Sequence, residues 1–170
     1  MKLGSLKEGG RDGTLIVVDR AVKRAVKATA VAPTLQRALE DWASAEPKLR
    51  ALAEQLAVGK AAGIFDLDPR TLAAPLPRAY QWADGSAYVV HVELVRKARG
   101  VEMPPSFWTD PLMYQGGSDS LIGPADDIEA IDEAHGIDFE GEIAVMVDDV
   151  PMGISPEAAR RHIKLVTILN

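Results

Sequence analysis

The sequence contains no cysteine among its 170 residues. Disulfide bonds, thiolate nucleophiles and zinc–thiolate sites are therefore excluded, and any bound metal must be held by carboxylates or imidazoles. Carboxylate-rich sites favour hard cations. Aromatic residues make up 5% of the chain, while 47% hydrophobic and 26% charged residues are typical of a globular protein that buries a core. The length suits one domain, or a small module followed by part of a larger one.

Long apolar runs are also missing from the sequence. No stretch approaches the roughly 18 residues of a membrane-spanning helix. The start, from Met1 to Gly13, alternates charge and glycine where a signal peptide needs an apolar run. We therefore expect a cytoplasmic protein without a membrane partner.

Basic residues are absent from one long part of the chain. Between Gly100 and Ala159 there is no lysine or arginine but there are fourteen Asp and Glu, whereas the first 99 residues hold sixteen of the nineteen basic residues. The net charge of -6 argues against nonspecific nucleic-acid binding. We expect most of these acids on a solvated surface, except where carboxylates lie within apolar patterning.

The beginning of the chain is expected to form a hairpin followed by helices. Leu3 to Leu6 and Thr14 to Asp19 are typical of two short strands, and a glycine-rich turn separates them. From Thr34 to Ala57, apolar residues recur at helical spacing. Pro47 interrupts this pattern, and Ser44 is available to cap a second helix.

A connection rich in proline and glycine follows, so we place a domain boundary near Leu72. This gives an N-terminal module over residues 1–72 and a second domain over residues 73–170. In the second domain, Ala87 to Arg99 has the apolar spacing of a helix, with Ser86 as the expected N-cap.

The remainder of the second domain contains a long loop and its clearest predicted strand. Ile137 to Val147 alternates between apolar residues and a second set that includes Glu140 and Glu142. Ser155 and the proline after it predict the start of a short helix. Lys164 to Leu169 is rich in β-branched and apolar residues, which indicates a last strand.

Glu140 and Glu142 are the strongest candidate ligands for a metal ion. Residues i and i+2 of a strand lie roughly 6.6 Å apart and point the same way, so two glutamates can converge on one ion. Mg²⁺ prefers oxygens at about 2.1 Å and Ca²⁺ at a somewhat longer distance. Gly141 leaves room for a neighbour, and no cation is near in sequence. The spacing alone also suits an exposed strand face with two solvated glutamates.

His91 is one of three histidines, and it follows Asp84 by seven residues and Tyr88 by three. A histidine on an apolar helical face is usually a packed, hydrogen-bonded core residue. The same position suits a general base, because a half-buried imidazole near a carboxylate can accept a proton from water. The residues by themselves leave both interpretations open.

Three runs of residues together resemble the fumarylacetoacetate hydrolase family, especially its bacterial members with a separate N-terminal domain. These runs are Pro75-Leu-Pro77, Ala87-Tyr-Val-Val-His91 and Asp138-Phe-Glu-Gly-Glu142-Ile-Ala-Val. The resemblance implies an α+β, β-rich fold, in which a small N-terminal module precedes the first part of a mixed β-sandwich roll. The family's further metal-binding aspartate would follow Asn170, so we expect the chain to be a truncated N-terminal half of a longer family member.

The resemblance also implies roles for individual residues. Glu140 and Glu142 would ligate Mg²⁺ or Ca²⁺, with Mn²⁺ as a third candidate, and Asp84 would be a further ligand. His91 would activate a water molecule. Substrate contacts are implied for Tyr88, Arg99, Tyr114 and Gln115. The chain departs from the family at Ala87, where an asparagine is usual.

The function implied by the resemblance is metal-dependent hydrolysis of a carbon–carbon bond in a 1,3-dicarbonyl acid such as fumarylacetoacetate. One alternative keeps the metal site but changes the reaction to decarboxylation, hydration or isomerisation of 2-oxo acids. Another alternative is a catalytically inactive fragment or assembly module, which acts only by packing against a partner. A homodimer is expected from the resemblance alone.

Overall fold

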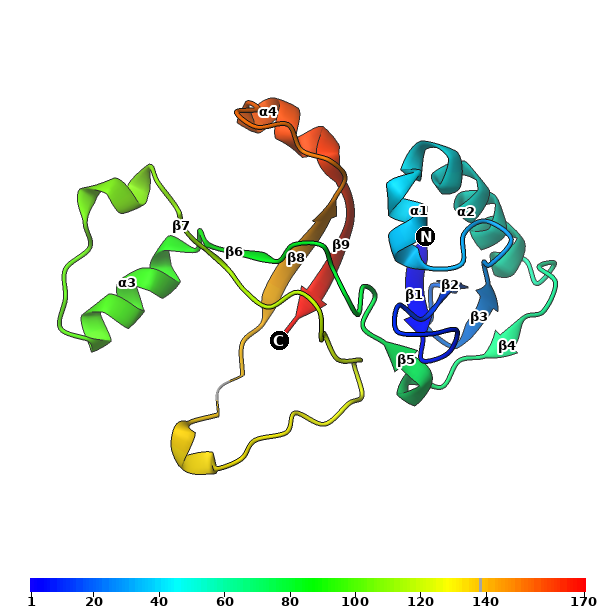
Figure 1. Ribbon diagram of the computed structural model, residues 1–170, viewed down its shortest axis with the longest axis horizontal. Coiled ribbons are helices and arrows are strands. Elements are labelled where there is room, and N and C mark those ends of the chain that lie inside the picture. The colour runs from blue at the N-terminus through cyan, green and yellow to red at the C-terminus, as the bar shows by residue number, and fades with distance from the viewer. Residues whose placement is uncertain (138) are drawn as a thin grey trace. The chain divides into compact units, whose positions relative to one another are not determined.

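The computed structural model describes residues 1–137 and 139–170 (Figure 1). The fold is mixed α+β, as predicted, and its sheets are antiparallel. The chain divides into two compact units, of which the first contains Met1–Pro77 and Ile122–Asn170 and the second contains Arg78–Leu121. Asp138, the first residue of the acidic run, lies outside the described residues. None of the helices in the described ranges is long and apolar enough to cross a membrane.

The N-terminal part of the first unit is built on a five-stranded sheet. Its strands are β1 (Lys2–Leu6), β2 (Thr14–Val18), β3 (Arg24–Lys27), β4 (Phe65–Asp66) and β5 (Leu72–Ala73), in the order β4-β3-β2-β1-β5. The predicted hairpin is confirmed, because β1 and β2 pair with Gly4 opposite Ile16. Gly13 closes its turn at a φ of 70°, where a Cβ atom would lie 2.6 Å from the Leu6 carbonyl oxygen. The turn therefore requires glycine at this position.

Two helices, α1 (Leu35–Glu40) and α2 (Trp42–Ala57), pack against this sheet. They bury the following residues together with Leu15, Val17 and Val26 of the sheet: Leu35, Ala38, Leu39, Trp42, Ala45, Leu49 and Leu56. The hydroxyl of Thr34 accepts a hydrogen bond from the Arg37 N–H at 3.2 Å and caps α1. The apolar spacing therefore predicted the helices and the core they enclose.

The predicted break between the two helices was wrong in position. The helices separate at Asp41, whereas Pro47 lies inside α2 and Ser44, the expected N-cap, lies in its first turn. Proline removes one backbone hydrogen bond from a helix. In α2, burial of Trp42, Ala45 and Leu49 on both sides of Pro47 outweighs that loss.

The second unit combines a two-stranded sheet with one helix. Its elements are β6 (Ala83–Ser86), α3 (Val89–Ala98), a 3₁₀ turn (Pro105–Trp108) and β7 (Leu112–Gln115). The predicted helix is confirmed, but it begins later than expected. Tyr88 is its N-cap, and Ser86 instead pairs with Leu112 as the last residue of β6. A residue whose backbone is used in strand pairing is not in position to cap the helix.

The C-terminal part of the first unit is a ribbon of two antiparallel strands, β8 (Glu142–Val147) and β9 (Ile163–Leu169). Between and before them lie the 3₁₀ turns Glu133–His135 and Arg160–His162 and the helix α4 (Pro156–Ala159). The Ser155 hydroxyl caps α4 by accepting from the Ala158 N–H at 3.3 Å, as predicted. β8 is shorter than the predicted strand, because its pairing with β9 begins at Glu142, opposite Leu169.

The two faces of this ribbon have opposite environments. Met146 of β8 and Leu165 of β9 pack against the core formed by α1, α2 and the N-terminal sheet. The other face is apolar but exposed, with Ile143 72% and Ile168 78% accessible, and these two residues are opposite each other in the strand pairing. The alternation predicted for β8 is therefore present, and the side that packs on the core is the one that carries Met146.

Candidate functional site

The two candidate metal ligands lie at the start of β8. Glu142 is the first residue of the strand and pairs with Leu169, while Glu140 precedes the strand. The backbone N–H of Glu140 donates a hydrogen bond to Oδ1 of Asn170 at 2.8 Å, so Asn170 holds the approach to the strand in place. Both glutamate side chains are exposed. Glu142 lies on the same side of β8 as Met146, because alternate residues of a strand share a face.

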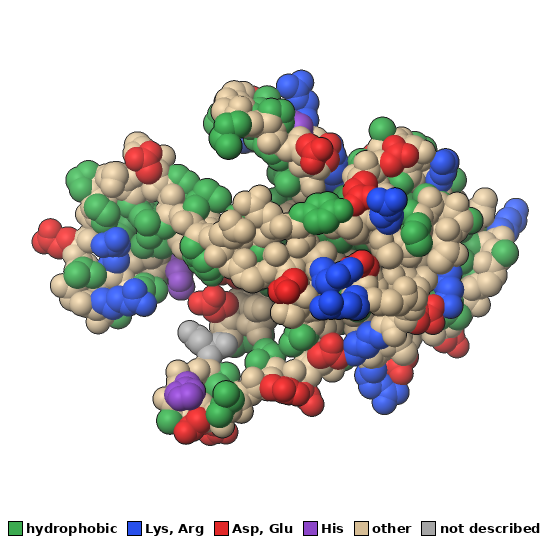
Figure 2. Space-filling view, in the orientation of Figure 1, with side chains coloured by type: hydrophobic (Ala, Val, Ile, Leu, Met, Phe, Trp, Pro, Cys, Tyr) green, Lys and Arg blue, Asp and Glu red, His purple; other side chains and the backbone are tan. Residues whose placement is uncertain are grey.

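Among the described residues, neither glutamate lies in an ion pair with a basic side chain. Figure 2 shows basic side chains over the N-terminal sheet and helices, over α3 and near α4. Two carboxylates without basic partners fit a hard divalent cation chemically. Within the described ranges, however, no group of three or more ligating side chains is assembled.

Asp84 and Tyr114 are brought together by the pairing of β6 with β7. They are directly opposite each other in the register, and the phenol of Tyr114 donates a hydrogen bond to Oδ2 of Asp84 at 3.0 Å. Asp84 is half-buried. Gln115 continues the same strand opposite Ala83. A candidate ligand and a candidate substrate contact, thirty residues apart in sequence, thus form one unit.

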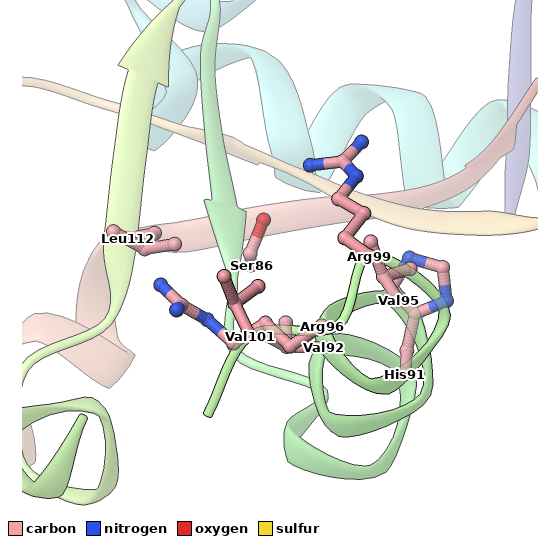
Figure 3. A pocket seen from close by; sticks show the side chains of 8 residues that line it. All are labelled: Ser86, His91, Val92, Val95, Arg96, Arg99, Val101 and Leu112. Carbon is pink, nitrogen blue, oxygen red and sulfur yellow. The ribbon is translucent and has the colours of Figure 1, made fainter. Parts of the chain in front are cut away.

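His91 and Arg99 lie along one pocket of the second unit (Figure 3). The pocket has a volume of about 280 Å³. Its lining consists of Ser86, His91, Val92, Val95, Arg96, Arg99, Val101 and Leu112. Helix α3 supplies four of these side chains and its C-cap Arg99 a fifth, because residues three and four apart share a helical face.

Three of the four predicted substrate contacts, Tyr88, Tyr114 and Gln115, lie outside the lining of this pocket. Tyr88 stands at the N-cap position of α3, and its side chain makes no capping hydrogen bond and is 79% exposed. No hydrogen bond or ion pair connects His91 with Asp84 among the described residues, although both belong to the second unit. The half-buried carboxylate–imidazole pair that motivated His91 as a general base is therefore not formed here.

Sequence reasoning missed Arg96 and a polar cluster on the β8–β9 ribbon. Arg96 lies three residues before Arg99 on α3, a helical spacing that would have revealed it. The cluster joins Asp148 to His162 at 2.5 Å and to Lys164 at 2.9 Å. The Lys164 hydrogen bond, followed by that of His162, holds the pKa of Asp148 below its ordinary value. Only the register of β8 and β9 brings these residues together.

Comparison with known families assigns both parts of the chain. Residues 1–78 match the family model for the fumarylacetoacetase N-terminal domain 2, and residues 81–170 match that for the fumarylacetoacetate hydrolase C-terminal domain. The two matches define an enzyme of the hydrolase or decarboxylase type. The chain belongs to the fumarylacetoacetate hydrolase family, whose enzymes commonly use divalent metals, and the predicted resemblance is confirmed. No curated protein matches the sequence.

Proposed function

We propose that this protein acts in the metal-dependent hydrolysis of a carbon–carbon bond in a 1,3-dicarbonyl acid such as fumarylacetoacetate. The main support is the placement of His91 and Arg99 along one pocket within the part of the chain that matches the C-terminal family domain. An imidazole and a guanidinium in one small cavity offer a proton acceptor and a partner for an acid. Such an arrangement suits attack of water on an anionic carbonyl substrate.

The metal is proposed to be held by Glu140 and Glu142, with Asp84 as a further ligand on the basis of the family resemblance. Mg²⁺ or Ca²⁺ suits these donors, with Mn²⁺ as a third candidate, because all three donors are carboxylate oxygens. When bound, the ion supplies positive charge that stabilises the oxygens of a diketone and of the enolate that departs.

The protein's own side chains have separate tasks in this proposal. A ring nitrogen of His91 takes the proton of the attacking water, while Arg99 binds a substrate carboxylate through its guanidinium. The hydroxyl of Tyr114 donates a hydrogen bond to Asp84 and so keeps that carboxylate oriented. Tyr88 and Gln115 are proposed as further substrate contacts.

We further propose that the C-terminal domain has the architecture of a mixed β-sandwich roll, and that the protein is a cytoplasmic homodimer. The exposed apolar face of the β8–β9 ribbon supports the sandwich, because in that architecture a second sheet covers such a face. The face also contains Val145 and Val166, which are opposite each other in the register.

A direct assay with Glu140→Gln tests the proposed function. The absorbance of fumarylacetoacetate is followed during incubation with the protein and Mg²⁺, and calorimetry measures Mg²⁺ binding in parallel. We expect the substitution to weaken both metal binding and turnover, because it removes a charged ligand. Glu54→Gln, at an exposed position of α2, is the matched control and should change neither. Full activity and unchanged metal affinity in E140Q would contradict the proposal.

Two alternatives are separated by the same measurements. Decarboxylation, hydration or isomerisation of a 2-oxo acid is favoured by the hydrolase or decarboxylase class of the family, and product analysis distinguishes it by release of carbon dioxide or by unchanged carbon number. An inactive assembly module is favoured by the lack of a three-ligand group within the described residues. In that case calorimetry should show weak Mg²⁺ binding and no substrate should be consumed.

A further inference from the structure

The turn between β2 and β3 holds a valine in a strained backbone conformation. Val22 has a φ of 57° and is the only non-glycine residue with a positive φ in the described ranges. This left-handed region is unfavourable for a β-branched side chain. Such strain persists only where the surrounding structure imposes it, and it is common at recognition sites and active sites. The turn is therefore a candidate for a role beyond connecting two strands.

Hydrogen bonds hold this turn in its shape. The Val22 N–H donates to the carbonyl oxygen of Asp19 at 3.2 Å, and the Lys23 N–H donates to Oδ1 of Asp19 at 2.9 Å. The Lys23 carbonyl oxygen accepts from the Leu67 N–H at 2.8 Å, which ties the turn to the residue after β4. The Val22 side chain stays 42% exposed. A firmly bonded frame thus presents the strained residue to solvent.

Cations surround Val22 at this end of the sheet. Arg20 and Lys23 are exposed residues of the same turn, and Lys2 is opposite the last residue of β2 in the strand pairing. None of these three cations forms an ion pair within the described residues. The turn therefore presents one apolar side chain among unpaired positive charges.

Two acids at the same end of the sheet are matched by a fourth cation, Arg24. Asp19 accepts a hydrogen bond from its Nε at 3.5 Å, and Asp66 is opposite it in the strand register. Asp19 is also occupied by the backbone of the turn. The charges of the other three cations are left for a partner with carboxylates.

A segment of complementary character lies in the acid-rich part of the same chain. Between Asp127 and Glu133, acids alternate with two exposed isoleucines, Ile128 and Ile131, of which Ile131 is 98% accessible. In the described part of the chain, the acids of this segment form no ion pair. An isoleucine exposed among carboxylates is the counterpart of a valine exposed among cations.

We propose that a second copy of this chain docks on the β2–β3 turn through its segment from Asp127 to Glu133. Ile131 of that copy packs against Val22, where both side chains leave water, and the acids lie beside the cations of the turn. Each copy carries both the turn and the segment, so two identical contacts form about a two-fold axis. This docking rests on the homodimer of the proposed function for the presence of a second copy, and it adds the surface that joins the two.

Charge reversal on both sides tests the contact. Analytical ultracentrifugation of the whole chain gives the dissociation constant of the dimer. Lys23→Glu and Glu129→Lys each place like charges opposite each other in both contacts, so each should raise this constant at least about tenfold. An equimolar mixture of K23E and E129K should return it to within about threefold of the unmodified value, because each contact of the mixed dimer again joins opposite charges.

A matched control and a salt series accompany these variants. Lys60→Glu makes the same change of charge at an exposed position after α2, so it should leave the dissociation constant unchanged. Added sodium chloride should weaken the unmodified dimer, because salt screens exposed charges. Circular dichroism confirms that each variant is folded.

Val22→Gly separates recognition from folding. Glycine adopts a φ of 57° without strain. Urea denaturation at a concentration where the chain is monomeric should therefore show V22G to be at least as stable as the unmodified protein. Its dimer should nevertheless dissociate more readily, because the apolar contact with Ile131 is lost. A V22G dimer as tight as the unmodified one would remove Val22 from the contact and contradict the proposal.

The remaining outcomes also decide the matter. A mixture of K23E and E129K that stays as weak as each variant alone would overturn the proposed contact. A dimer that salt strengthens and that neither variant changes would overturn it too, and would point to the exposed face of the β8–β9 ribbon. In both cases the homodimer itself still stands. A chain that is monomeric at every concentration would refute the homodimer and the contact together, whereas a lack of carbon–carbon bond cleavage would leave both untouched.

Discussion

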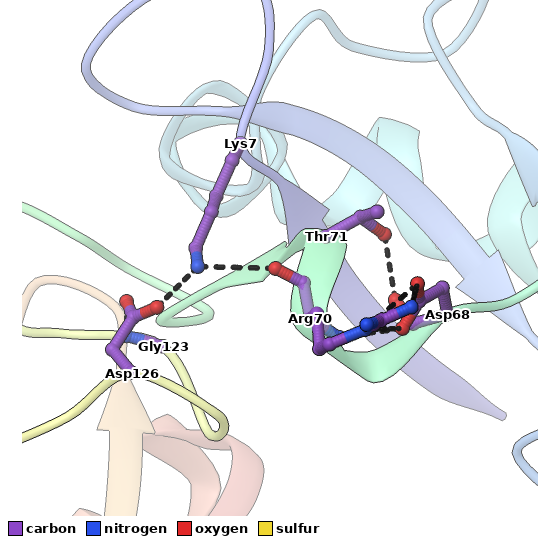
Figure 4. A network of polar contacts seen from close by, with 6 residues as sticks. All are labelled: Lys7, Asp68, Arg70, Thr71, Gly123 and Asp126. Carbon is purple, nitrogen blue, oxygen red and sulfur yellow. Dashed lines mark hydrogen bonds and ion pairs between the residues drawn. The ribbon is translucent and has the colours of Figure 1, made fainter.

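Lys7 and Asp126, 119 residues apart in the sequence, form an ion pair that joins the end of β1 to the segment after Ile122. The Lys7 ammonium also donates to the carbonyl oxygen of Arg70 at 3.1 Å, and Oδ2 of Asp126 accepts from the Gly123 N–H at 2.8 Å (Figure 4). The contact lies within the first unit and connects the two segments of which that unit is composed. It thereby links residues of both matched family domains.

This ion pair predicts a pH-dependent carboxylate. Hydrogen bonding by Lys7, followed by that of Gly123, holds the pKa of Asp126 below its ordinary value. A lowered folded-state pKa stabilises the fold above the unfolded-state pKa of about 4, and this contribution is lost as the pH falls through the folded-state pKa. In Lys7→Gln we expect the pKa of Asp126 to rise towards the ordinary value without reaching it, because the Gly123 bond remains.

An NMR titration of the side-chain carboxyl carbon measures this pKa. Lys2→Gln is the matched control, since Lys2 is an exposed residue of β1, the strand that Lys7 directly follows. A pKa of Asp126 that is the same in K7Q and in the unmodified protein would show that the ion pair is not maintained in solution.

Gly123 is predicted to be essential for the fold of the first unit. A Cβ atom there would lie 2.2 Å from the carbonyl oxygen of Leu72, and a backbone group cannot withdraw as a flexible side chain can. We expect Gly123→Ala to lower the free energy of unfolding by about 1–3 kcal/mol, the usual range for overpacking. Gly117→Ala is the control, because no atom lies within 4 Å of the added Cβ and its φ does not require glycine. Urea denaturation compares the two, and equal stability of both variants would refute the steric argument.

The Asp148 cluster is predicted to make the β8–β9 ribbon sensitive to acid. The pKa of Asp148 is lowered in the folded protein, so its ionised carboxylate stabilises the fold above the unfolded-state pKa. This stabilisation is lost as the pH falls through the folded-state pKa. In Asp148→Asn we expect a loss of about 1 kcal/mol or less at neutral pH, since the carboxylate is 35% exposed and solvent screens the pair. Asp149→Asn, at the exposed neighbouring position, should have little effect.

Thermal unfolding of both variants between pH 3 and pH 7 checks this prediction. The stability difference between D148N and the unmodified protein should shrink as the pH is lowered, because the native carboxylate becomes protonated. A difference that is independent of pH would mean that the substitution acts through packing and not through charge.

The hydrogen bond from Tyr114 to Asp84 predicts an indirect effect on metal binding. If Asp84 is a ligand, Tyr114→Phe should lower the affinity for Mg²⁺ by about 10-fold to 100-fold, because groups that orient a ligand commonly matter to that extent. Calorimetry measures the affinity. Met113→Leu changes the adjacent, 66% exposed residue of β7 and is the control. Unchanged affinity in Y114F would remove Asp84 from the ligand set or show that the phenol does not orient it.

Local patterns in the sequence were sufficient for several parts of the fold and of the site. The hairpin of β1 and β2, the helices around Leu39 and Leu49 and the capping of α4 by Ser155 were all predicted, since each depends on residues close together in the chain. The candidate glutamates and His91 were also found from the sequence, because their motifs are short. Their roles stay predictions.

Other features depend on contacts between distant segments. Pro47 was predicted to separate the two helices, but they separate at Asp41, because packing of α2 outweighed the local signal of the proline. Ser86 was predicted to cap a helix, but strand pairing places it in β6. No pattern indicated that Asp148 would meet Lys164, since this contact follows from the register of two strands.

By itself, the sequence determined the family, the α+β composition and the chemistry that is available, which is that of carboxylates, imidazoles and guanidinium groups. Only the tertiary structure decided that Asp84 accepts a hydrogen bond from Tyr114, and that Arg96 shares a pocket with Arg99 and His91. The physical reason is that residue type and spacing specify local conformation, whereas strand register and packing decide which distant side chains meet.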